Sequence, residues 1–581
     1  MLQRLLPLKP YLARYKKRYV AGFLCLIVAQ GVGITPPLII KAGIDALSAD
    51  VTSRKLLFYS GLLLGVALTK AVFQFWQRWI LIGISRDAEY DLRNDLFSHL
   101  MRLSPRFYTE TPTGDLMSKL TNDLNAVRNL VGPGIMYSAG TATLGIATIS
   151  IMLSLDWRLT LLALAPMPLV SVAVKVFGKM IHDRFEKIQE MYSRLTEKVR
   201  ENLSGVRVIR AFTQEDAEMA EFDLMNHEFV QKNRGLIWIT SSMWPAMALL
   251  FGLAFMLIMI VGGRHVLSGQ ISVGTFAAFN VYVFYLIWPI IAVGWVMNLL
   301  ERGLASLRRL NTIFEAKPEI TDAEVRPEAP RAIRGEIEFR NLNFSYNGRP
   351  ILKNLNLHIP AGRTLAIVGA TGSGKSTLVG LIPRLYDAPP GTVLIDGVPV
   401  REIPIEVLRS NIGFVPQETF LFSESIRENM KFGTLNASDA DVERAAEISN
   451  ILPDIQGFPR GFDTMVGERG LTLSGGQKQR TAISRAVIRD PRILILDDAL
   501  SSVDTYTEER ILGHLTEVLT GRTTLLISHR VSTIRNADEI VVLHDGAIAE
   551  RGRHEDLLAL NGHYAELYNK QLIEEALEQE A

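Results

Sequence analysis

The sequence predicts a chain of two unlike parts, an all-helical membrane domain of six helices followed by an α/β domain. Hydrophobic residues make up 48% of the 581 residues, whereas charged residues make up only 21%. Six long apolar stretches all lie before residue 301, and short β-branched runs alternate with helical segments after residue 335. A chain of this length is also too long for a single hydrophobic core.

The apolar stretches have the length of membrane spans. Crossing about 30 Å of hydrocarbon takes about 20 helical residues. Six stretches meet this requirement if a few polar side chains face the protein interior: residues 19–44, 55–83, 134–155, 157–181, 243–266 and 272–300. The intervening segments 84–133 and 182–242 are long, charged and rich in arginine, and such segments favour the cytoplasm. We therefore expect a multi-pass protein of the plasma (inner) membrane with both termini and the second domain cytoplasmic.

Changes in composition mark the expected domain boundaries. Residues 1–316 form the membrane domain with its long loops, residues 317–334 form a polar, proline-containing linker, and residues 335–581 form the α/β domain with C-terminal helices. The basic amphipathic stretch from Lys9 to Arg18 is interpreted as an uncleaved helix along the cytoplasmic face, or else as a solvated start to the first span.

Charge and cysteine content exclude other classes. The formal net charge of +1 lacks the concentrated basic excess of nucleic-acid-binding proteins, so no nucleic-acid partner is expected. Cys25, the one cysteine, lies in an apolar run. A disulfide framework or a cysteine-based zinc site within the chain is therefore excluded.

The first chemical signal is a glycine-rich turn between an apolar strand and a helix. It consists of Gly369, Ala370, Thr371, Gly372, Ser373, Gly374, Lys375, Ser376 and Thr377. Glycines let the backbone wrap around a polyphosphate, while consecutive N–H groups and the helix N-terminus point at its oxygens. Lys375 would neutralise the β and γ phosphates, and the Ser376 hydroxyl would ligate Mg²⁺. ATP and Mg²⁺ are thus the expected cofactors of a P-loop NTPase domain.

A pair of carboxylates follows a second apolar strand, Ile493 to Leu496. Next to a phosphate loop, the first carboxylate, Asp497, would hold Mg²⁺ through water, and the second, Asp498, could polarise the attacking water. The alternative interpretation is that the two acids only cap the following helix.

Between these two motifs lies the quintet Leu473, Ser474, Gly475, Gly476 and Gln477, which resembles the signature of the ATP-binding-cassette transporters letter for letter. Four further residues resemble the rest of the family set in order: Tyr346, which would stack on adenine, Gln417, which would sense Mg²⁺ and the membrane domain, Asp504, in the loop after the metal strand, and His529, which would contact the γ phosphate. The loop Thr464 to Gly470 resembles that of the exporters, as do the membrane-half segments Thr113 to Asp123 and Val208 to Gln214.

The resemblance implies the ABC exporter fold, ATPase activity coupled to transport, and a second half-transporter as partner. In the family, each ATP lies between the phosphate loop of one chain and the signature of the other. Ser474 and Gly476 would then donate hydrogen bonds to the γ phosphate held by the partner. The implied catalytic residues are Asp498, His529, Gln417 and Lys375, and the implied metal site consists of Ser376, Gln417 and Asp497.

The sequence departs from the family pattern at Asp498, where efficient ATPases of the family have glutamate. Losing one methylene retracts the carboxylate by about 1.5 Å, and a misplacement of about 1 Å can cost ~10²-fold in rate. This favours a heterodimer in which the chain's own ATP site is degenerate and its signature serves the partner's site. The alternative is a homodimer in which Asp498 still reaches the water.

The transported solute is much less well defined. Aromatic and methionine side chains of the fifth and sixth spans, together with Asn280, suit drugs or lipids, although the same residues could serve packing: Met243, Trp244, Met247, Met256, Met259, Tyr282, Tyr285, Trp288 and Trp295. Polar residues near membrane depth should face a cavity or one another, or snorkel: Lys41, Lys70, Gln74, Gln77 and Arg78. A peptide exporter and an ATP-gated channel or regulator remain the alternative functions.

Overall fold

The computed structural model of the protein describes residues 7–49, 52–326, 330, 332–434, 436–470, 472–503, 505–519 and 521–580. By its internal contacts the chain divides into two compact units. Unit 1 comprises Met1–Met101 and Thr113–Ala316, and unit 2 comprises Arg102–Pro112 and Lys317–Ala581. The sequence places the short segment Arg102–Pro112 in the membrane domain, but its contacts group it with unit 2.

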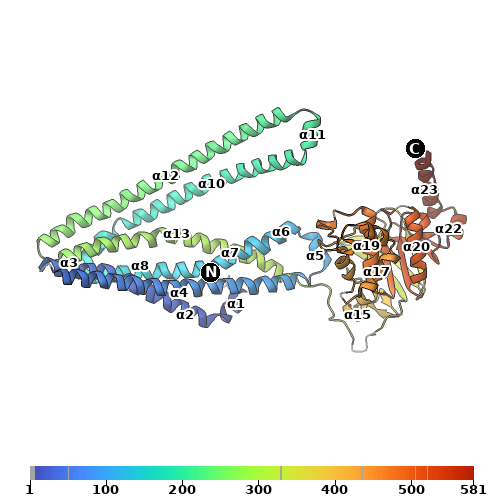
Figure 1. The fold of residues 1–581 in the computed structure, drawn as a ribbon, viewed down its shortest axis with the longest axis horizontal. Coiled ribbons are helices and arrows are strands. Elements are labelled where there is room, and N and C mark those ends of the chain that lie inside the picture. Colours follow the sequence, from blue (N-terminus) through green and yellow to red (C-terminus); the bar gives the residue numbers. More distant parts are fainter. Residues whose placement is uncertain are drawn as a thin grey trace. The chain divides into compact units, whose positions relative to one another are not determined.

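Unit 1 is entirely helical in its described residues (Figure 1). Its elements are α1 (Lys9–Arg14), α2 (Lys16–Gly33), α3 (Pro36–Ala49), α4 (Ser53–Leu100), α6 (Thr113–Ser118), η2 (Lys119–Asp123), α7 (Leu124–Asn129), η3 (Leu130–Gly134), α8 (Ile135–Leu155), α9 (Trp157–Leu164), α10 (Met167–Ser204), α11 (Val206–Ala211), α12 (Glu215–Leu267) and α13 (Val273–Glu315).

Six helical stretches of unit 1 are long and apolar enough to cross a membrane, which confirms the six expected spans. They are Lys16–Ser48, Ser53–Leu100, Thr113–Leu155, Trp157–Ser204, Glu215–Leu267 and Val273–Glu315. Most of them run far beyond the roughly 20 residues that a bilayer requires. At about 1.5 Å per residue, the 53 residues of α12 span about 80 Å, so a large part of this helix lies outside the hydrocarbon.

Local sequence explains where these helices break. The first span is interrupted between α2 and α3, where Pro36 and Pro37 cannot supply the N–H groups that a continuous helix needs. Asp156 separates α8 from α9 in extended backbone, and its carboxylate accepts hydrogen bonds from the N–H groups of Arg158 and Leu159. This is an N-cap, which satisfies N–H groups that would otherwise have no partner. The basic N-terminal stretch is likewise divided, since α1 ends at Arg14 and α2 begins at Lys16.

Helices α10 and α12 form a long hairpin closed by the short helix α11. Figure 1 shows the hairpin extending away from the other helices of unit 1 toward α11. Its tip carries apolar side chains in water-accessible positions, with Leu203 71% exposed, Val208 61% and Phe212 71%. Exposed apolar side chains grouped in this way are typical of a surface that contacts another protein.

Unit 2 combines two sheets with surrounding helices (Figure 1). Its six-stranded sheet has the order β10-β9-β3-β8-β7-β6, and its four-stranded sheet has the order β2-β1-β4-β5. The strands are β1 (Ile337–Tyr346), β2 (Arg349–Ile359), β3 (Thr364–Val368), β4 (Val393–Ile395), β5 (Val398–Pro399), β6 (Ile412–Val415), β7 (Ile493–Asp497), β8 (Thr523–Ile527), β9 (Glu539–His544) and β10 (Ala547–Gly552).

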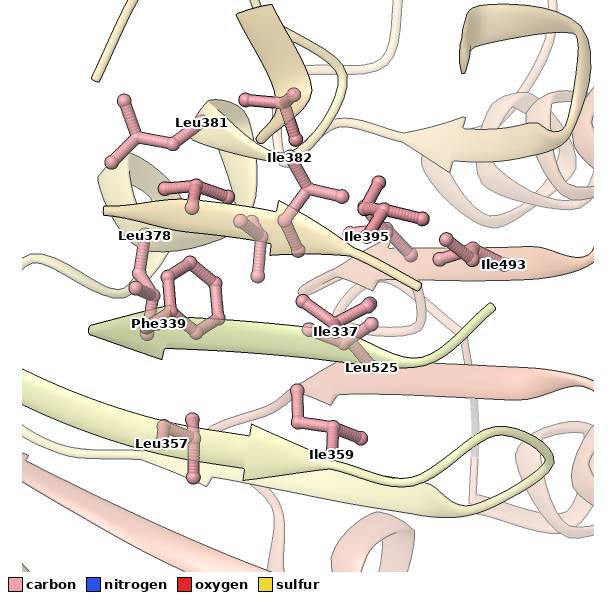
Figure 2. Packing of buried hydrophobic residues seen from close by; sticks show 14 of the residues in the cluster. Ile337, Phe339, Leu357, Ile359, Leu378, Leu381, Ile382, Ile395, Ile493 and Leu525 are labelled. Atoms are coloured by element: carbon pink, nitrogen blue, oxygen red, sulfur yellow. The ribbon is translucent and has the colours of Figure 1, made fainter. Parts of the chain in front are cut away.

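The larger sheet is parallel from β6 to β9, and β10 adds an antiparallel edge. Strands β3, β7 and β8 are buried along almost their whole length, as is typical of parallel strands that are covered on both faces. Figure 2 shows the core between the two sheets, where Phe339 of β1 and Ile395 of β4 pack with Leu378 of α14 and Leu525 of β8. This confirms the predicted helical membrane domain joined to an α/β domain.

The helices of unit 2 are mostly short. They are α5 (Pro105–Glu110), α14 (Lys375–Leu381), η4 (Val400–Glu402), α15 (Ile405–Ser410), α16 (Ile426–Lys431), α17 (Asp439–Ile448), α18 (Leu452–Gly457), η5 (Gly461–Asp463), η6 (Glu468–Gly470), α19 (Gly475–Val487), α20 (Thr505–Leu519), α21 (Val531–Ile534), α22 (His554–Leu560) and α23 (His563–Glu580).

Helix α5 is held to the rest of unit 2 by polar contacts. Arg106 donates a hydrogen bond to the Asn347 side chain at 2.6 Å, and Ser104 donates one to Glu319 at 3.2 Å. Glu110 accepts a hydrogen bond from Asn347 at 3.4 Å. Asn347 directly follows Tyr346, so a segment that lies between membrane helices in the sequence contacts the turn beside the expected adenine-stacking residue.

Candidate nucleotide-binding site

The candidate site lies where four neighbouring parallel strands end. The glycine-rich turn follows β3, Gln417 lies shortly after β6, Asp497 ends β7, and His529 lies shortly after β8. Because β3, β8, β7 and β6 are adjacent and parallel, their carboxyl ends share one edge of the sheet. Ligands of open α/β sheets bind at this edge.

A cavity of about 250 Å³ occupies this position. Its wall contains most of the phosphate loop and both aspartates: Ile351, Thr371, Gly372, Gly374, Lys375, Ser376, Thr377, Gln417, Asp497, Asp498, Ile527 and His529. The fold therefore gathers into one cavity residues that are separated by more than 150 positions in the sequence. Ile351 and Ile527 were not expected from the sequence, because an isoleucine in a strand gives no signal beyond its strand pattern.

The glycines of the loop are required by its backbone. Gly369, Gly372 and Gly374 have φ of +151°, +82° and +101°, and residues other than glycine rarely adopt such backbone angles. A Cβ on Gly369 would lie only 2.2 Å from the carbonyl oxygen of Leu543, and one on Gly374 would lie 2.8 Å from Leu352. Any larger residue at either position would push the loop out of the shape that encloses the cavity.

The Lys375 side chain is fixed inside this loop by hydrogen bonds to the backbone. Its ammonium donates hydrogen bonds to the carbonyl oxygens of Gly369 at 2.8 Å and of Ala370 at 3.0 Å. Burial lowers the pKa of Lys375, and the nearby carboxylates of Asp497 and Asp498 oppose this shift. Among the described residues, the opposing charges near this cation are thus the carboxylates of Asp497 and Asp498. A polyphosphate entering the cavity would supply a stronger partner.

Asp497 is buried and only partly satisfied. Burial raises its pKa, while a hydrogen bond from Ser376 and the positive charge of Lys375 act against the rise. Among the described residues, Asp497 Oδ1 and the Ser373 hydroxyl are buried without a hydrogen-bond partner. Buried polar atoms of this kind usually meet a ligand or water.

The oxygen donors of Asp497 and Ser376 fit Mg²⁺, which binds one or two protein oxygens together with substrate phosphates. No group of three or more His, Cys, Asp or Glu side chains suited to a metal occurs in the described part of the chain. A magnesium ion here would therefore depend on the nucleotide for several of its ligands.

Asp498 has an unusual backbone. Its φ is +49°, in the left-handed region, and its N–H donates a hydrogen bond to the carbonyl of Ile527 at 2.9 Å. Aspartate and asparagine tolerate this conformation better than longer side chains do. The side chain lines the cavity beside Asp497, so the carboxylate is present at the site even though it is one methylene short of glutamate.

Tyr346 lies next to the phosphate loop rather than in the cavity wall. Its ring packs edge-on against Tyr386, with ring centroids 5.1 Å apart. Burial raises the pKa of its hydroxyl, and its hydrogen bond with Thr377 acts in the opposite direction. Tyr386 is a neighbour that sequence reasoning missed, because it precedes no recognisable motif.

The signature residues have a different environment. Ser474 is the N-cap of α19: its hydroxyl accepts from the Gln477 N–H at 3.2 Å, and the Gln477 side chain accepts from the Ser474 N–H at 3.1 Å. A Cβ on Gly476 would lie 2.9 Å from the Ser502 carbonyl oxygen, whereas Gly475 faces the Ser502 side chain. Ser474 and Gly475 are exposed, and the signature residues are absent from the described wall of the cavity.

The remaining expected site residue, Asp504, lies outside the described residues. In unit 1, two expected cargo residues are packing residues instead. Tyr282 is fully buried and donates a hydrogen bond to the Ile34 carbonyl at 2.9 Å, and Met247 is 2% exposed within the same core. Trp244, Met259 and Trp288 are exposed on their helices, and Gln77 is buried.

Comparison with known families gives matches in both units. Residues 19–290 match the ABC transporter transmembrane region, and residues 352–501 match the ABC transporter family. The second match begins in β2 and ends shortly after Asp498, so it covers the phosphate loop, the signature and both aspartates.

Curated relatives match nearly the whole chain. A probable multidrug resistance ABC transporter ATP-binding/permease protein of Bacillus subtilis is 37% identical over 96% of this chain and 96% of its own length. A multidrug resistance-like ATP-binding protein of Escherichia coli is 34% identical over 98% of this chain and 96% of its own length. An ATP-dependent lipid A-core flippase of Syntrophus aciditrophicus is 35% identical over 97% of this chain and 94% of its own length.

A solved structure also matches both units. A bacterial Atm1-family ABC exporter with ATP bound has a TM-score of 0.76 and 27% identity, and the match covers 96% of this chain and 99% of that one. Members of this family act as dimers within a membrane. With six apolar helices joined to a nucleotide-binding unit, the chain belongs to the ABC transporter family and is a multi-pass membrane ATPase of exporter architecture that couples ATP to transport.

Proposed function

We propose that the chain is one half of a heterodimeric exporter that moves amphipathic drugs or lipids by alternating access, and that its own ATP site is the degenerate one. The proposal rests on a difference between the phosphate-loop cavity and the signature helix of this chain. The phosphate-loop cavity ends in the short carboxylate of Asp498, whereas the signature helix is intact, capped and exposed.

The need for a second chain rests on what this chain lacks around its nucleotide site. A γ phosphate near Lys375 would meet no signature donor of the same chain within the described cavity wall. The apolar tip of the α10–α12 hairpin gives independent support, because Leu203, Val208 and Phe212 are exposed in the single chain. A partner chain would cover such a surface.

Within the site, each residue has a proposed task. Lys375 and the backbone of Gly372 and Gly374 would bind and orient the phosphates, and Ser376, Gln417 and Asp497 would hold Mg²⁺. The ion would neutralise phosphate charge when bound. His529 and Asp498 would contact the γ phosphate and the attacking water. Asp504 follows Asp498 by six positions in the sequence and would also belong to the site.

The cargo proposal rests on the relatives and on the membrane side chains that stay exposed. The relatives' names refer to multidrug resistance and to a lipid A-core flippase. Trp244, Met256, Met259, Trp288 and Trp295 are each between 47% and 64% exposed and provide adaptable apolar surface. We place the protein in the plasma (inner) membrane, with both termini and unit 2 cytoplasmic, because six spans return the chain to its starting side.

Substitutions at Asp498 test the degenerate site. Asp498→Asn should leave the turnover of the assembled transporter nearly unchanged, because a carboxylate that takes no part in hydrolysis can be replaced without loss of rate. Asp498→Glu should raise ATP turnover by roughly tenfold or more, since the added methylene restores about 1 Å or more of reach. ATP hydrolysis by the purified, reconstituted protein is the measurement. A collapse of turnover in Asp498→Asn would establish the homodimer with a working aspartate instead.

Asp545 is a matched control for the backbone cost of these changes. It also has a left-handed φ, +47°, but its side chain is 87% exposed on the turn between β9 and β10. Asp545→Glu should cost about the same 1 kcal/mol in stability as Asp498→Glu without changing turnover.

An ATP-gated channel is tested separately: an exporter concentrates a fluorescent amphiphile in inside-out proteoliposomes against its gradient, whereas a channel only equilibrates it.

A further inference from the structure

A second cavity lies in unit 1, far along the sequence from every nucleotide motif. It measures about 560 Å³ and is formed by the start of α2 and the middle of α4. Its wall consists of Arg18, Phe75, Arg78, Trp79, Ile82, Gly83, Arg86 and Asp87. Three arginines and one aspartate leave a formal excess of two positive charges, next to two large aromatic rings.

Counting residues along α2 and α4 puts the cavity at the depth expected for lipid headgroups. The apolar part of α4 begins after Lys55, and about 20 residues of helix, or about 30 Å, carry it across the hydrocarbon to the region of Phe75. Arg78 and Arg86 follow within about three helical turns, and Arg18 immediately precedes the apolar part of α2. All three cations therefore lie at the membrane surface from which α4 continues as a charged helix.

The negative side chains near the cavity leave much of its positive charge uncompensated. Asp87 pairs with Arg18 at 2.5 Å, and Arg86 reaches Glu89 at 3.1 Å. Glu89 also pairs with Arg93 at 2.6 Å and lies 3.7 Å from Arg128, so three arginines share this carboxylate. Arg78 is exposed. An anion entering the cavity would meet cations that the protein's own carboxylates only partly neutralise.

The aromatic wall suits the part of a lipid next to its phosphate. Phe75 and Trp79 stack on one another with centroids 6.1 Å apart and ring planes at 16°, and their side chains are 59% and 67% exposed. Tryptophan at this depth is typical of the membrane interface, with its ring against glycerol and upper acyl chain. A free anion in water would gain nothing from these rings.

We propose that this cavity, formed by Arg18, Arg78 and Arg86 with Phe75 and Trp79, binds the phosphate of an anionic phospholipid in the leaflet on the side of α4's charged extension. Basic pockets between membrane helices bind such headgroups. The site is separate from the proposed cargo surface of α12 and α13 and from the nucleotide site, so an anionic lipid here is a bound component of the transporter rather than its cargo. The proposal requires the membrane location but not the heterodimer.

Lipid titration of the purified full-length chain in detergent tests the proposal, with native mass spectrometry as the readout. Phosphatidylglycerol should bind at least roughly tenfold more tightly than phosphatidylcholine with the same acyl chains, because each arginine near the surface contributes about 1 kcal/mol to anionic-lipid attraction. Arg78→Gln should weaken phosphatidylglycerol binding about fivefold and leave phosphatidylcholine unchanged. Equal binding of the two lipids by the unaltered protein would overturn the proposal.

Two further variants separate a built site from general charge. Arg54→Gln makes the same charge change at an exposed position at the other end of α4 and should leave binding unaltered. Asp87→Asn removes the carboxylate that competes for Arg18 and should strengthen phosphatidylglycerol binding, a direction that damage to the fold would not produce. Equal losses in Arg54→Gln and Arg78→Gln would refute the cavity as the binding site.

Soluble anions and ATP provide the last distinction. Glycerol 3-phosphate should compete only weakly, because it lacks the acyl region that contacts Phe75 and Trp79; competition at the concentration of the lipid itself would assign the cavity to a soluble phosphate instead. ATP affinity should be the same in all of these variants. A preparation that binds phosphatidylglycerol but not ATP would fail the proposed function while leaving the lipid site intact.

Discussion

The phosphate loop and the signature belong to the same unit, yet their surroundings differ sharply. Lys375 is buried in a cavity that its own chain lines with twelve residues, and its hydrogen-bond partners are backbone carbonyls of the loop. Ser474 is exposed at the start of α19, and its hydrogen bonds only stabilise its own helix end. In the described part of the chain, the phosphate loop thus lines a cavity, whereas no signature residue lines that cavity.

The contrast fits the proposed pairing, in which the phosphate loop of one chain would meet the signature of another. Under that proposal, the cavity would bind nucleotide within one chain, whereas the exposed cap would act only when another chain presents a phosphate. Loss of the first should be visible in binding, and loss of the second only in turnover. The following predictions separate these two readouts.

The largest effect is expected at Lys375. Lys375→Ala removes the buried ammonium and should weaken ATP binding to this chain by about 10²-fold, because a charge-assisted contact to phosphate is worth roughly 3 kcal/mol. Photocrosslinking of an azido-ATP analogue to the purified chain is the measurement. Lys353→Ala, at an exposed position on β2, is the control and should label normally. Unchanged labelling of Lys375→Ala would show that the cavity does not hold the phosphates.

A smaller effect, in turnover only, is expected at Ser474. Ser474→Ala should lower ATP hydrolysis by the assembled dimer roughly tenfold, since one hydrogen bond to a charged phosphate is lost. Photolabelling of the chain's own site should not change. If labelling falls together with turnover, the division between cavity and clamp is wrong.

Ser438 offers a matched control for the cap itself. It begins α17 with the same reciprocal arrangement, in which Asp441 takes the place of Gln477. Ser438→Ala should cost about 1 kcal/mol of stability, as expected for a lost N-cap, and should leave turnover unaltered. Equal losses of turnover in the two variants would mean that the Ser474 effect is only structural.

The smallest effect is a stability change at Asp497. Burial raises the pKa of this carboxyl group, so its ionisation is more costly in the folded than in the unfolded protein. Its favourable contribution to stability is complete below the unfolded pKa of about 3.9 and is lost as the pH rises through the higher folded pKa. At neutral pH, Asp497→Asn should therefore raise the apparent Tm of the nucleotide-free protein by about 2–4 °C.

Magnesium reverses the sign of this effect. With ATP present, Mg²⁺ should stabilise the unaltered protein but not Asp497→Asn, because the variant lacks the anionic oxygen that the ion needs. Differential scanning fluorimetry with and without Mg²⁺ is the measurement, and Asp545→Asn, an exposed aspartate, is the control. A Tm that falls in nucleotide-free Asp497→Asn would contradict the burial argument.

Particular residues show how far sequence reasoning reaches. The loop from Gly369 to Thr377 could be recognised because phosphate binding needs glycines, a lysine and a helix start in a fixed local order. Ile351 and Tyr386 could not be recognised, because their place beside the site depends on β2 and on the segment after α14, whose patterns report only local structure. For Tyr282 the structure decides in favour of packing, since helical spacing alone does not reveal which face of α13 is packed against Ile34.

By itself, the sequence determined the six apolar spans, the phosphate loop, the paired aspartates and the signature, because each depends on residues close together in the chain. Only the tertiary structure decided that Arg102–Pro112 packs with unit 2, that Asp498 has left-handed backbone, and that Arg18 meets Arg78 and Arg86 around one cavity. Each of these features depends on how separate helices and strands pack against one another. Local patterns of hydrophobicity do not encode that packing.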